Sequence, residues 1–132
     1  MEQLKTLISK KIFPRQGRIY MPHEIKKYLF DIQQAIEQIE TFLKDKTYEH
    51  FIVESILQSA VERQFEIIGE ALYRIRKIDE TYLSKIADAH KIIGFRNVIS
   101  HGYDIIDSKI IWDAVKLNLP KLKNEINNLM RI

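Results

Sequence analysis

The stretch AVERQFEIIGEALYRI, residues 60–75, decides the fold class. Its apolar residues recur at steps of three and four, which is the spacing of one face of an α-helix. We expect this helix to run from about residue 49 to residue 77, and the pattern leaves room for a bend near its start. The positions expected to face a core are Ile52, Ile56, Ala60, Phe65, Ile68, Leu72 and Ile75.

The opposite side of this helix carries charges of both signs at helical spacing, on Arg63, Glu66, Glu70 and Arg74. Two interpretations remain open. The side chains can form ion pairs on a solvated face, where each pair contributes roughly a few tenths of a kcal/mol. Alternatively, Glu70 and Arg63 line a cleft. Gly69 favours a close approach at this level, because a glycine inside a helix costs about 1 kcal/mol relative to alanine.

The segment before this helix has the same apolar spacing. Pro22 suits the first turn of a helix, where its missing N–H costs nothing, and the pattern continues to about residue 46. Thr47 is a plausible N-cap for the helix that follows. The expected buried stripe of this first helix is Ile25, Tyr28, Leu29, Ile32, Ile36, Ile39 and Leu43.

Shorter helices are expected after residue 77. Asp79 or Thr81 can cap a short helix over residues 81–87, and a further helix is expected over residues 89–101. The next glycine, Gly102, can adopt the left-handed conformation that ends helices.

The last part of the chain predicts two helices separated by a proline. Ser108 is expected to cap the first of them, and Pro120 is expected to bend or restart the chain into the second. No alternating strand, internal repeat or low-complexity tract interrupts the series. The sequence therefore predicts an all-α fold, a bundle of four to six helices with short connections.

The composition fits a single domain without cysteine. The chain has 132 residues, enough for one core, and no cysteine for disulfides or thiolate metal sites. No apolar run approaches the roughly 18 to 20 residues of a membrane-spanning helix, and the N-terminus lacks the apolar segment of a signal peptide. These features predict a soluble protein of a reducing cytoplasm.

The basic character of the chain is concentrated at its N-terminus. The formal net charge is +3 and the calculated pI is about 9.0. Residues 1–21 hold five basic residues and one acidic residue, a net of +4, which leaves residues 22–132 at −1. We interpret residues 1–21 as a basic N-terminal extension and residues 22–132 as the helical domain. Two origins of the extension stay open, a natural start at Met21 or an arm that docks on a partner.

A polar cluster closes the helix expected over residues 89–101. The stretch FRNVISHGYD, residues 95–104, concentrates polar side chains at Arg96, Asn97, Ser100, His101 and Tyr103. In a structural interpretation, the histidine is a cation at the negative end of the helix dipole and the arginine is a solvated surface residue.

In a catalytic interpretation, Arg96 and His101 cleave RNA without a metal ion. Histidine titrates near neutral pH, so it can move a proton to or from the ribose 2′-hydroxyl or the leaving oxygen. Arginine keeps its charge and holds phosphate oxygens as negative charge accumulates on them. Asn97 lies on the same helix face as His101 and can orient the histidine or the phosphate. Transesterification needs both a base and an acid, and a two-fold dimer would supply the second histidine.

The remaining histidines do not indicate a metal site. His23, His50 and His90 are scattered along the chain, and no glycine-rich phosphate loop or G-x-S-x-G motif occurs. Asp104 and Asp107 are expected to belong to the turn before the next helix.

Together these stretches resemble a known family. AVERQFEIIGEAL, followed by IIGFRNVISHGYDIID, IWDAV and LPKL, is similar to the HepT-like toxins of the HEPN superfamily. The resemblance covers about residues 22–130. Arg96, His101 and Tyr103 match the family's ribonuclease motif, and Asn97 matches the polar residue that usually follows the arginine.

The resemblance implies an antiparallel HEPN-type bundle that forms a homodimer with two Arg-His motifs in one cleft. It implies a metal-independent RNA endonuclease without a cofactor, acting as the toxin of a type VII toxin–antitoxin pair. The antitoxin of this family, MntA, is a small nucleotidyltransferase that silences the toxin by attaching AMP to the motif tyrosine, here Tyr103. A second hypothesis stays open, in which the same cleft is not catalytic and binds a nucleotide or docks a nucleotidyltransferase.

Overall fold

The computed structural model describes residues 21–101 and 107–131, and of residues 96–101 it describes the helical backbone only. All the regular structure in these ranges is helical, which confirms the predicted all-α class. The elements are α2 (His23–Phe42), α3 (Tyr48–Val53), α4 (Ser55–Ile78), the 3₁₀ segment η2 (Glu80–Lys85), α5 (Ala89–His101), α6 (Ser108–Asp113), the π-helical segment η3 (Ala114–Asn118) and α7 (Leu119–Met130).

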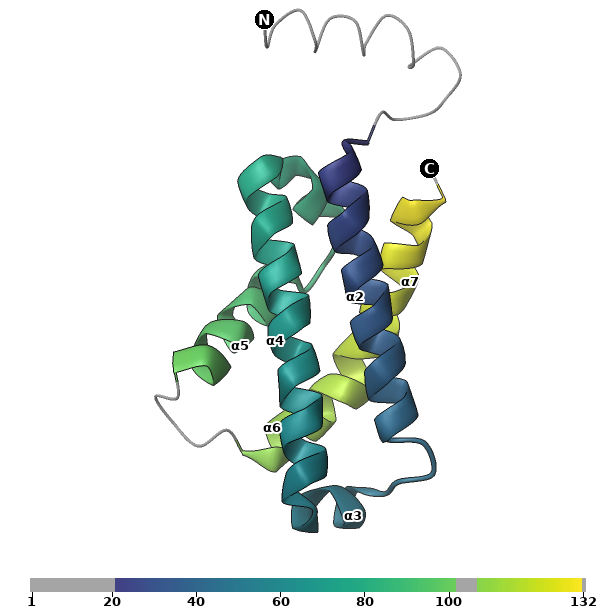
Figure 1. Cartoon of the computed structure of the whole chain (residues 1–132), viewed down its shortest axis with the longest axis vertical. Coiled ribbons are helices and arrows are strands. Elements are labelled where there is room, and N and C mark those ends of the chain that lie inside the picture. The colour runs from purple at the N-terminus through teal and green to yellow at the C-terminus, as the bar shows by residue number, and fades with distance from the viewer. Residues whose placement is uncertain (1–20, 102–106, 132) are drawn as a thin grey trace, which may run out of the picture.

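The two longest helices, α2 and α4, run antiparallel and form the centre of the bundle (Figure 1). The flanking helix α5 packs on α4, and α7 packs on α2. The short helices α3 and α6 contact each other at the lower end of the bundle in this view (Figure 1). The arrangement agrees with the expected antiparallel bundle.

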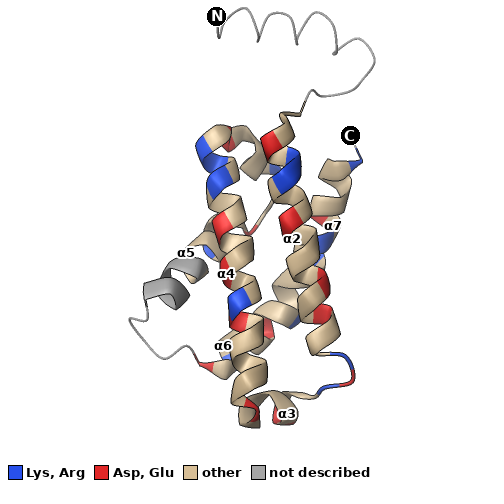
Figure 2. Ribbon diagram, in the orientation of Figure 1, with Lys and Arg blue, Asp and Glu red and all other residues tan. Residues whose placement is uncertain are grey.

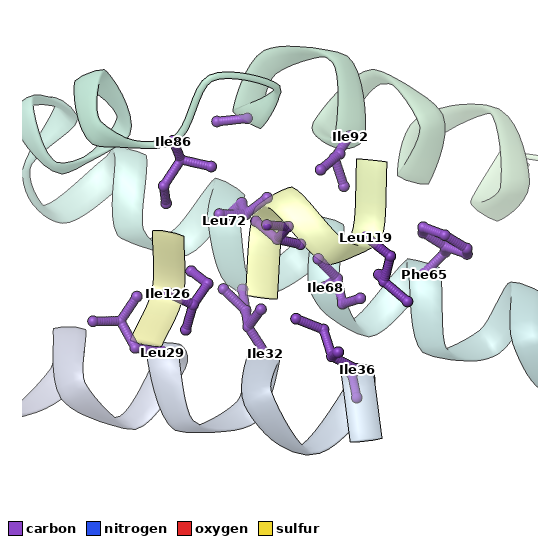
Figure 3. Packing of buried hydrophobic residues seen from close by; sticks show 14 of the residues in the cluster. Leu29, Ile32, Ile36, Phe65, Ile68, Leu72, Ile86, Ile92, Leu119 and Ile126 are labelled. Atoms are coloured by element: carbon purple, nitrogen blue, oxygen red, sulfur yellow. The ribbon is translucent and has the colours of Figure 1, made fainter. Parts of the chain in front are cut away.

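The core is built from the apolar stripes of α2, α4, α5 and α7 (Figure 3). The α4 positions Phe65, Ile68, Leu72 and Ile75 are buried as predicted. Among the described side chains no polar or charged residue is buried, so hydrophobic burial rather than a polar network stabilises the interior. The buried α2 stripe is Ile25, Leu29, Ile32, Ala35, Ile36 and Ile39.

The helix predicted from residue 49 to residue 77 is interrupted at Glu54. This residue has φ −105° and ψ 93°, an extended conformation that separates α3 from α4. Phe51 is buried instead, with its ring 5.5 Å from the Trp112 ring.

The prediction that Ile52 and Ile56 face the core was wrong, since their side chains are 44% and 85% exposed. Ile52 lies before the break, so the register of α4 does not extend to it. Ile56 lies on α4, but the apolar stripe at this end of the helix runs through Val61 and the partly buried Leu57.

The N-terminal cap of α3 was predicted correctly. The Thr47 hydroxyl accepts a hydrogen bond from the His50 amide at 3.3 Å, and the Thr47 amide donates to His50 Nδ1 at 3.0 Å. This reciprocal pair is a capping box, and it satisfies amide groups that the first helical turn leaves unpaired.

The structure decides between the two residues suggested as the cap of η2 and corrects the cap expected for α6. Asp79 caps η2, since its carboxylate accepts from the Thr81 amide at 3.0 Å. Ser108 is not the cap of α6. The preceding residue, Asp107, takes that position and accepts from the Lys109 amide at 2.9 Å. Asp and Ser are comparably good caps, so local preference did not distinguish them.

The chain from α6 to α7 is a continuous helical segment with a change of winding. The π-helical turns of η3 lie directly before Pro120, which falls in the first turn of α7. Proline lacks an N–H and crowds the preceding turn, and a wider π turn accommodates it. The bend or restart expected at Pro120 takes the form of this change of winding within a continuous helical segment.

Candidate active site

Helix α5 is the element that carries the motif, and its first half is anchored on α4. Ala89, Ile92 and Ile93 are buried. The Phe95 ring meets the Phe65 ring of α4 edge to face, with 5.6 Å between the ring centroids, a favourable geometry for aromatic pairs. Apolar packing therefore fixes the path of α5 up to the residue before Arg96.

The motif residues occupy the last two turns of α5. Arg96, Asn97, Ser100 and His101 belong to this helix, which ends at His101 as expected. Their side chains lie outside the described residues, as does the whole of Tyr103. The roles assigned to these five residues therefore remain predictions.

The charged side of α4 forms two separate ion pairs. Arg63 Nη1 lies 3.2 Å from Glu66 Oε2, and Arg74 Nε donates to Glu70 Oε1 at 2.9 Å. Pairs of this kind were one of the two interpretations of the α4 charge pattern. Because these side chains are largely exposed, each pair contributes about 0.3–0.5 kcal/mol.

A groove of about 470 Å³ lies between α2 and α4. Arg63 and Glu70 both line it, together with other residues of α2 and α4. Their place in the cleft of the motif remains a prediction. The apolar floor of the groove includes Tyr28, Ile67 and Ala71. The other lining residues are Lys27, Asp31, Glu66 and Arg74.

The contribution of α2 to this groove was not predicted from the sequence. Lys27 and Asp31 form an ion pair at 3.1 Å with the spacing of one helical turn, so a local signal for the pair existed. Nothing in local spacing indicates, however, that this pair faces α4.

Gly69 is buried on α4, the helix against which α5 packs.

One carboxyl group on α4 has an altered acidity. Partial burial raises the pKa of Glu62 above its usual range, and the neighbouring negative charge of Glu66 raises it further. Both effects disfavour the ionised form. Sequence analysis did not single out Glu62, and its spacing to Glu66 is the only local signal of this interaction.

Polar contacts also hold the start of α5 in place. Asn118 Nδ2 donates to Asp88 Oδ2 at 2.9 Å, and Glu125 accepts from the Ala87 amide at 3.0 Å. The hydrogen bond from Asn118 lowers the pKa of Asp88, and the charge of Lys121 lowers it further. These contacts tie the beginning of α5 to η3 and α7.

No group of three or more metal-ligating side chains occurs within residues 21–95 and 107–131. In the same part of the chain, no helix is long and apolar enough to cross a membrane. His50 acts in a helix cap, and His90 lies beside Arg76 with 3.4 Å between Nδ1 and Nη1.

Comparison with known proteins defines the class. The model of the HepT-like ribonuclease family matches residues 32–129. The chain is 34% identical over 111 residues to a probable ribonuclease HepT of Thermococcus cleftensis, covering 84% of this chain and 100% of the relative. It is 34% identical over 105 residues to a putative RNase of Methanocaldococcus jannaschii, covering 78% of this chain and 94% of the relative. No solved structure gives a significant match.

The chain therefore belongs to the HepT-like ribonuclease family. Its helical bundle is of the HEPN type, and the resemblance found in the sequence is confirmed.

Proposed function

We propose that this protein is a metal-independent RNA endonuclease and the toxin of a type VII toxin–antitoxin pair. The observation that carries the proposal is the position of the motif. In a chain of the HepT-like ribonuclease family, Arg96 and His101 lie in the last two turns of a helix whose preceding turns are packed on α4.

The proposed reaction is transesterification of RNA. The His101 imidazole removes the proton from the ribose 2′-hydroxyl, and the 2′-oxygen forms a bond to phosphorus as the bond to the 5′-oxygen breaks. A second histidine gives a proton to the departing 5′-oxygen. Arg96 stabilises the negative charge on the phosphate oxygens, and Asn97 orients the histidine or the phosphate. Glu70, Ser100 and Arg63 are candidate cleft-lining residues.

The second histidine requires a second copy of the chain, and an exposed apolar surface supports a homodimer. Ile52, Val53, Ile56 and Ile110 form the terminal apolar surface, where α3 contacts both α4 and α6. Val53 and Ile56 are 77% and 85% exposed. Water-exposed aliphatic side chains grouped in this way favour association. A two-fold axis buries the same patch of both subunits against itself.

The double substitution Val53→Glu and Ile56→Glu is expected to separate the dimer and abolish cleavage. Burial of one such side chain is worth about 1.5–3 kcal/mol, so we expect dimer affinity to fall at least 100-fold, a rough estimate at about 1.4 kcal/mol per tenfold. Sedimentation velocity measures the association. Phe30→Glu is the control, because Phe30 is also exposed but lies on α2, outside this surface. A variant that remains dimeric would rule out this surface as the interface.

The nuclease activity is tested by incubating purified protein with RNA in EDTA. We expect cleavage to continue in EDTA and to stop when the substrate lacks the 2′-hydroxyl, because that hydroxyl is the attacking group. Strand scission is measured on denaturing gels. Loss of activity in EDTA that is restored by a divalent cation would contradict the metal-independent mechanism.

The proposed partner is an MntA-like nucleotidyltransferase that attaches AMP to Tyr103. A phosphate-containing group two residues from His101 would block the cleft and repel RNA phosphate. Mass spectrometry of the protein after incubation with ATP and such an enzyme checks the site. A Tyr103→Phe variant that is still silenced by the enzyme would contradict it.

A second candidate function is a non-catalytic subunit that binds a nucleotide or docks a nucleotidyltransferase. The groove between α2 and α4 favours this alternative, because it combines an apolar floor with cationic side chains from both helices. Calorimetry with nucleotides, together with growth after induction, separates the two functions. Tight nucleotide binding without RNA cleavage or a growth defect would favour the subunit.

A further inference from the structure

A group of basic and aromatic side chains lies at the end of the bundle where α4 finishes and α5 begins. Tyr73, Arg76 and Lys77 belong to the last turns of α4, and His90 and Lys91 belong to the first turn of α5. We name these five residues the α4–α5 cationic cluster. Figure 2 shows the basic residues gathered on the last turns of α4.

The cluster is organised around the Tyr73 ring. The Arg76 guanidinium carbon lies 5.4 Å from the ring centroid, and Lys77 Nζ lies 5.8 Å from it. Arg76 Nη1 also reaches His90 Nδ1 at 3.4 Å, across the gap between the two helices. The tertiary structure thus combines side chains of two helices into one surface.

The cations of the cluster differ from those of the neighbouring groove. Lys27, Arg63 and Arg74 each form an ion pair on their own helix. In contrast, no carboxylate within the described ranges forms an ion pair with Arg76 or Lys77. Their charge is therefore available to an external anion.

This combination suits the phosphates of a nucleic-acid strand. Cations without a carboxylate partner neutralise phosphates of the backbone, and cation–π contacts with the Tyr73 ring hold Arg76 and Lys77 close together. The surface is local, since residues 22–132 have a formal net charge of −1. A general attraction for polyanions is thus not expected from the body of the protein.

We propose that the α4–α5 cationic cluster binds the backbone of the RNA strand that the motif cleaves, at nucleotides displaced from the cut. The proposal rests on the proposed function for the identity of the ligand. Helix α5 leads from His90 in the cluster to His101 in the motif. At 1.5 Å per residue this distance is about 16 Å. A stacked strand at about 3.4 Å per nucleotide spans it with about five nucleotides.

The basic N-terminal extension joins the chain at the same end. α2 begins beside the end of α4 (Figure 1), and residues 1–21, with five basic residues, precede α2 in the chain.

The cluster also has a structural contribution that the experiment must separate. Arg76 and Lys77 lie in the last turn of α4, where cations interact favourably with the helix dipole. That effect is independent of RNA and of strand length. A loss of affinity that depends on strand length therefore distinguishes RNA binding from helix stability.

The test compares Arg76→Gln/Lys77→Gln with Lys44→Gln/Lys123→Gln, a control that removes the same charge from the turn after α2 and from α7. Binding of labelled 2′-O-methyl RNA of 4 and 12 nucleotides is measured by fluorescence anisotropy at several salt concentrations. We expect the first variant to bind the longer strand at least about tenfold more weakly. Its salt slope should fall by about 1.4, since each phosphate contact on a single strand contributes about 0.7. The short strand should bind both variants equally.

Melting temperatures of all variants are recorded, and Lys77→Gln/Lys91→Gln replaces the first variant if that variant does not fold. Equal affinity of the cluster variant and the control for the longer strand would overturn the proposal. The same loss for both strand lengths would overturn it as well, because the cations would then act at the cut itself.

Cleavage of unmodified RNA by the unaltered protein is measured in parallel. If the protein does not cleave RNA but its binding of RNA depends on the cluster, the proposed nuclease function is wrong and the cluster remains an RNA-binding site. If the cluster variant cleaves and binds RNA as well as the unaltered protein does, only the proposal for the cluster is wrong.

Discussion

Replacing His101 with alanine is expected to lower the rate of RNA cleavage by about 100- to 10,000-fold, the usual contribution of a positioned general acid or base. In the proposed dimer the loss is at the upper end of this range, because one substitution removes both the base and the acid. Arg96→Ala is expected to lower the rate by about 100- to 1,000-fold, since it removes a charge that stabilises the transition state.

The measurement is the initial rate of scission at saturating RNA in EDTA. His23→Ala is the control, because His23 is exposed at the start of α2 and lies in no proposed site. Both motif variants should keep the melting temperature and dimer affinity of the unaltered protein. A His101→Ala protein that cleaves RNA at the original rate would disprove the catalytic assignment.

Replacing Phe65 with alanine is expected to lower the free energy of unfolding by about 3–5 kcal/mol. Phe65 is only 1% exposed and packs edge to face on Phe95 of α5. The substitution removes apolar burial, leaves a cavity and eliminates the aromatic contact. Because Phe95 directly precedes Arg96, we also expect slower cleavage at temperatures where the variant is folded.

Urea denaturation followed by circular dichroism measures this loss. Phe30→Ala is the matched control, since the Phe30 side chain is 51% exposed, and its expected cost is below about 1 kcal/mol. A loss for Phe65→Ala no larger than that of the control would mean that the α4–α5 contact contributes little to stability.

The core of α4 followed from the sequence, whereas the start of this helix did not. Apolar residues at steps of three and four predicted the burial of Phe65, Ile68, Leu72 and Ile75, and all four are buried. The same periodicity failed at Ile52, because the helix is interrupted at Glu54. The contact of Phe51 with Trp112 accompanies this break. Because Trp112 is distant in sequence, the local spacing of apolar residues does not predict this contact.

The helix caps show that the local sequence does not always decide between neighbouring residues. Thr47 was predicted from its own preference and its position before an apolar run, and its hydrogen bonds confirm it. At the start of α6 two good caps, Asp107 and Ser108, are adjacent in sequence. Only the backbone conformation decided between them, placing Asp107 outside the helix.

In the candidate site, too, the local features were predicted from the sequence and the contacts between helices were not. The motif and its position at the end of α5 were read from the sequence, as was the family resemblance. The sequence did not predict the groove between α2 and α4, which is lined by Lys27, Tyr28, Asp31, Arg63 and Glu70. Its formation depends on which face of α2 lies against α4.

The sequence by itself determined the helices, the apolar stripes that bury them and the Arg-His motif, because these properties depend on residues within one or two turns of each other. The tertiary structure alone decided that Phe51 packs on Trp112 and that Arg76 meets His90. Such contacts join elements distant in the chain, and they follow from how the helices pack to bury their apolar stripes together.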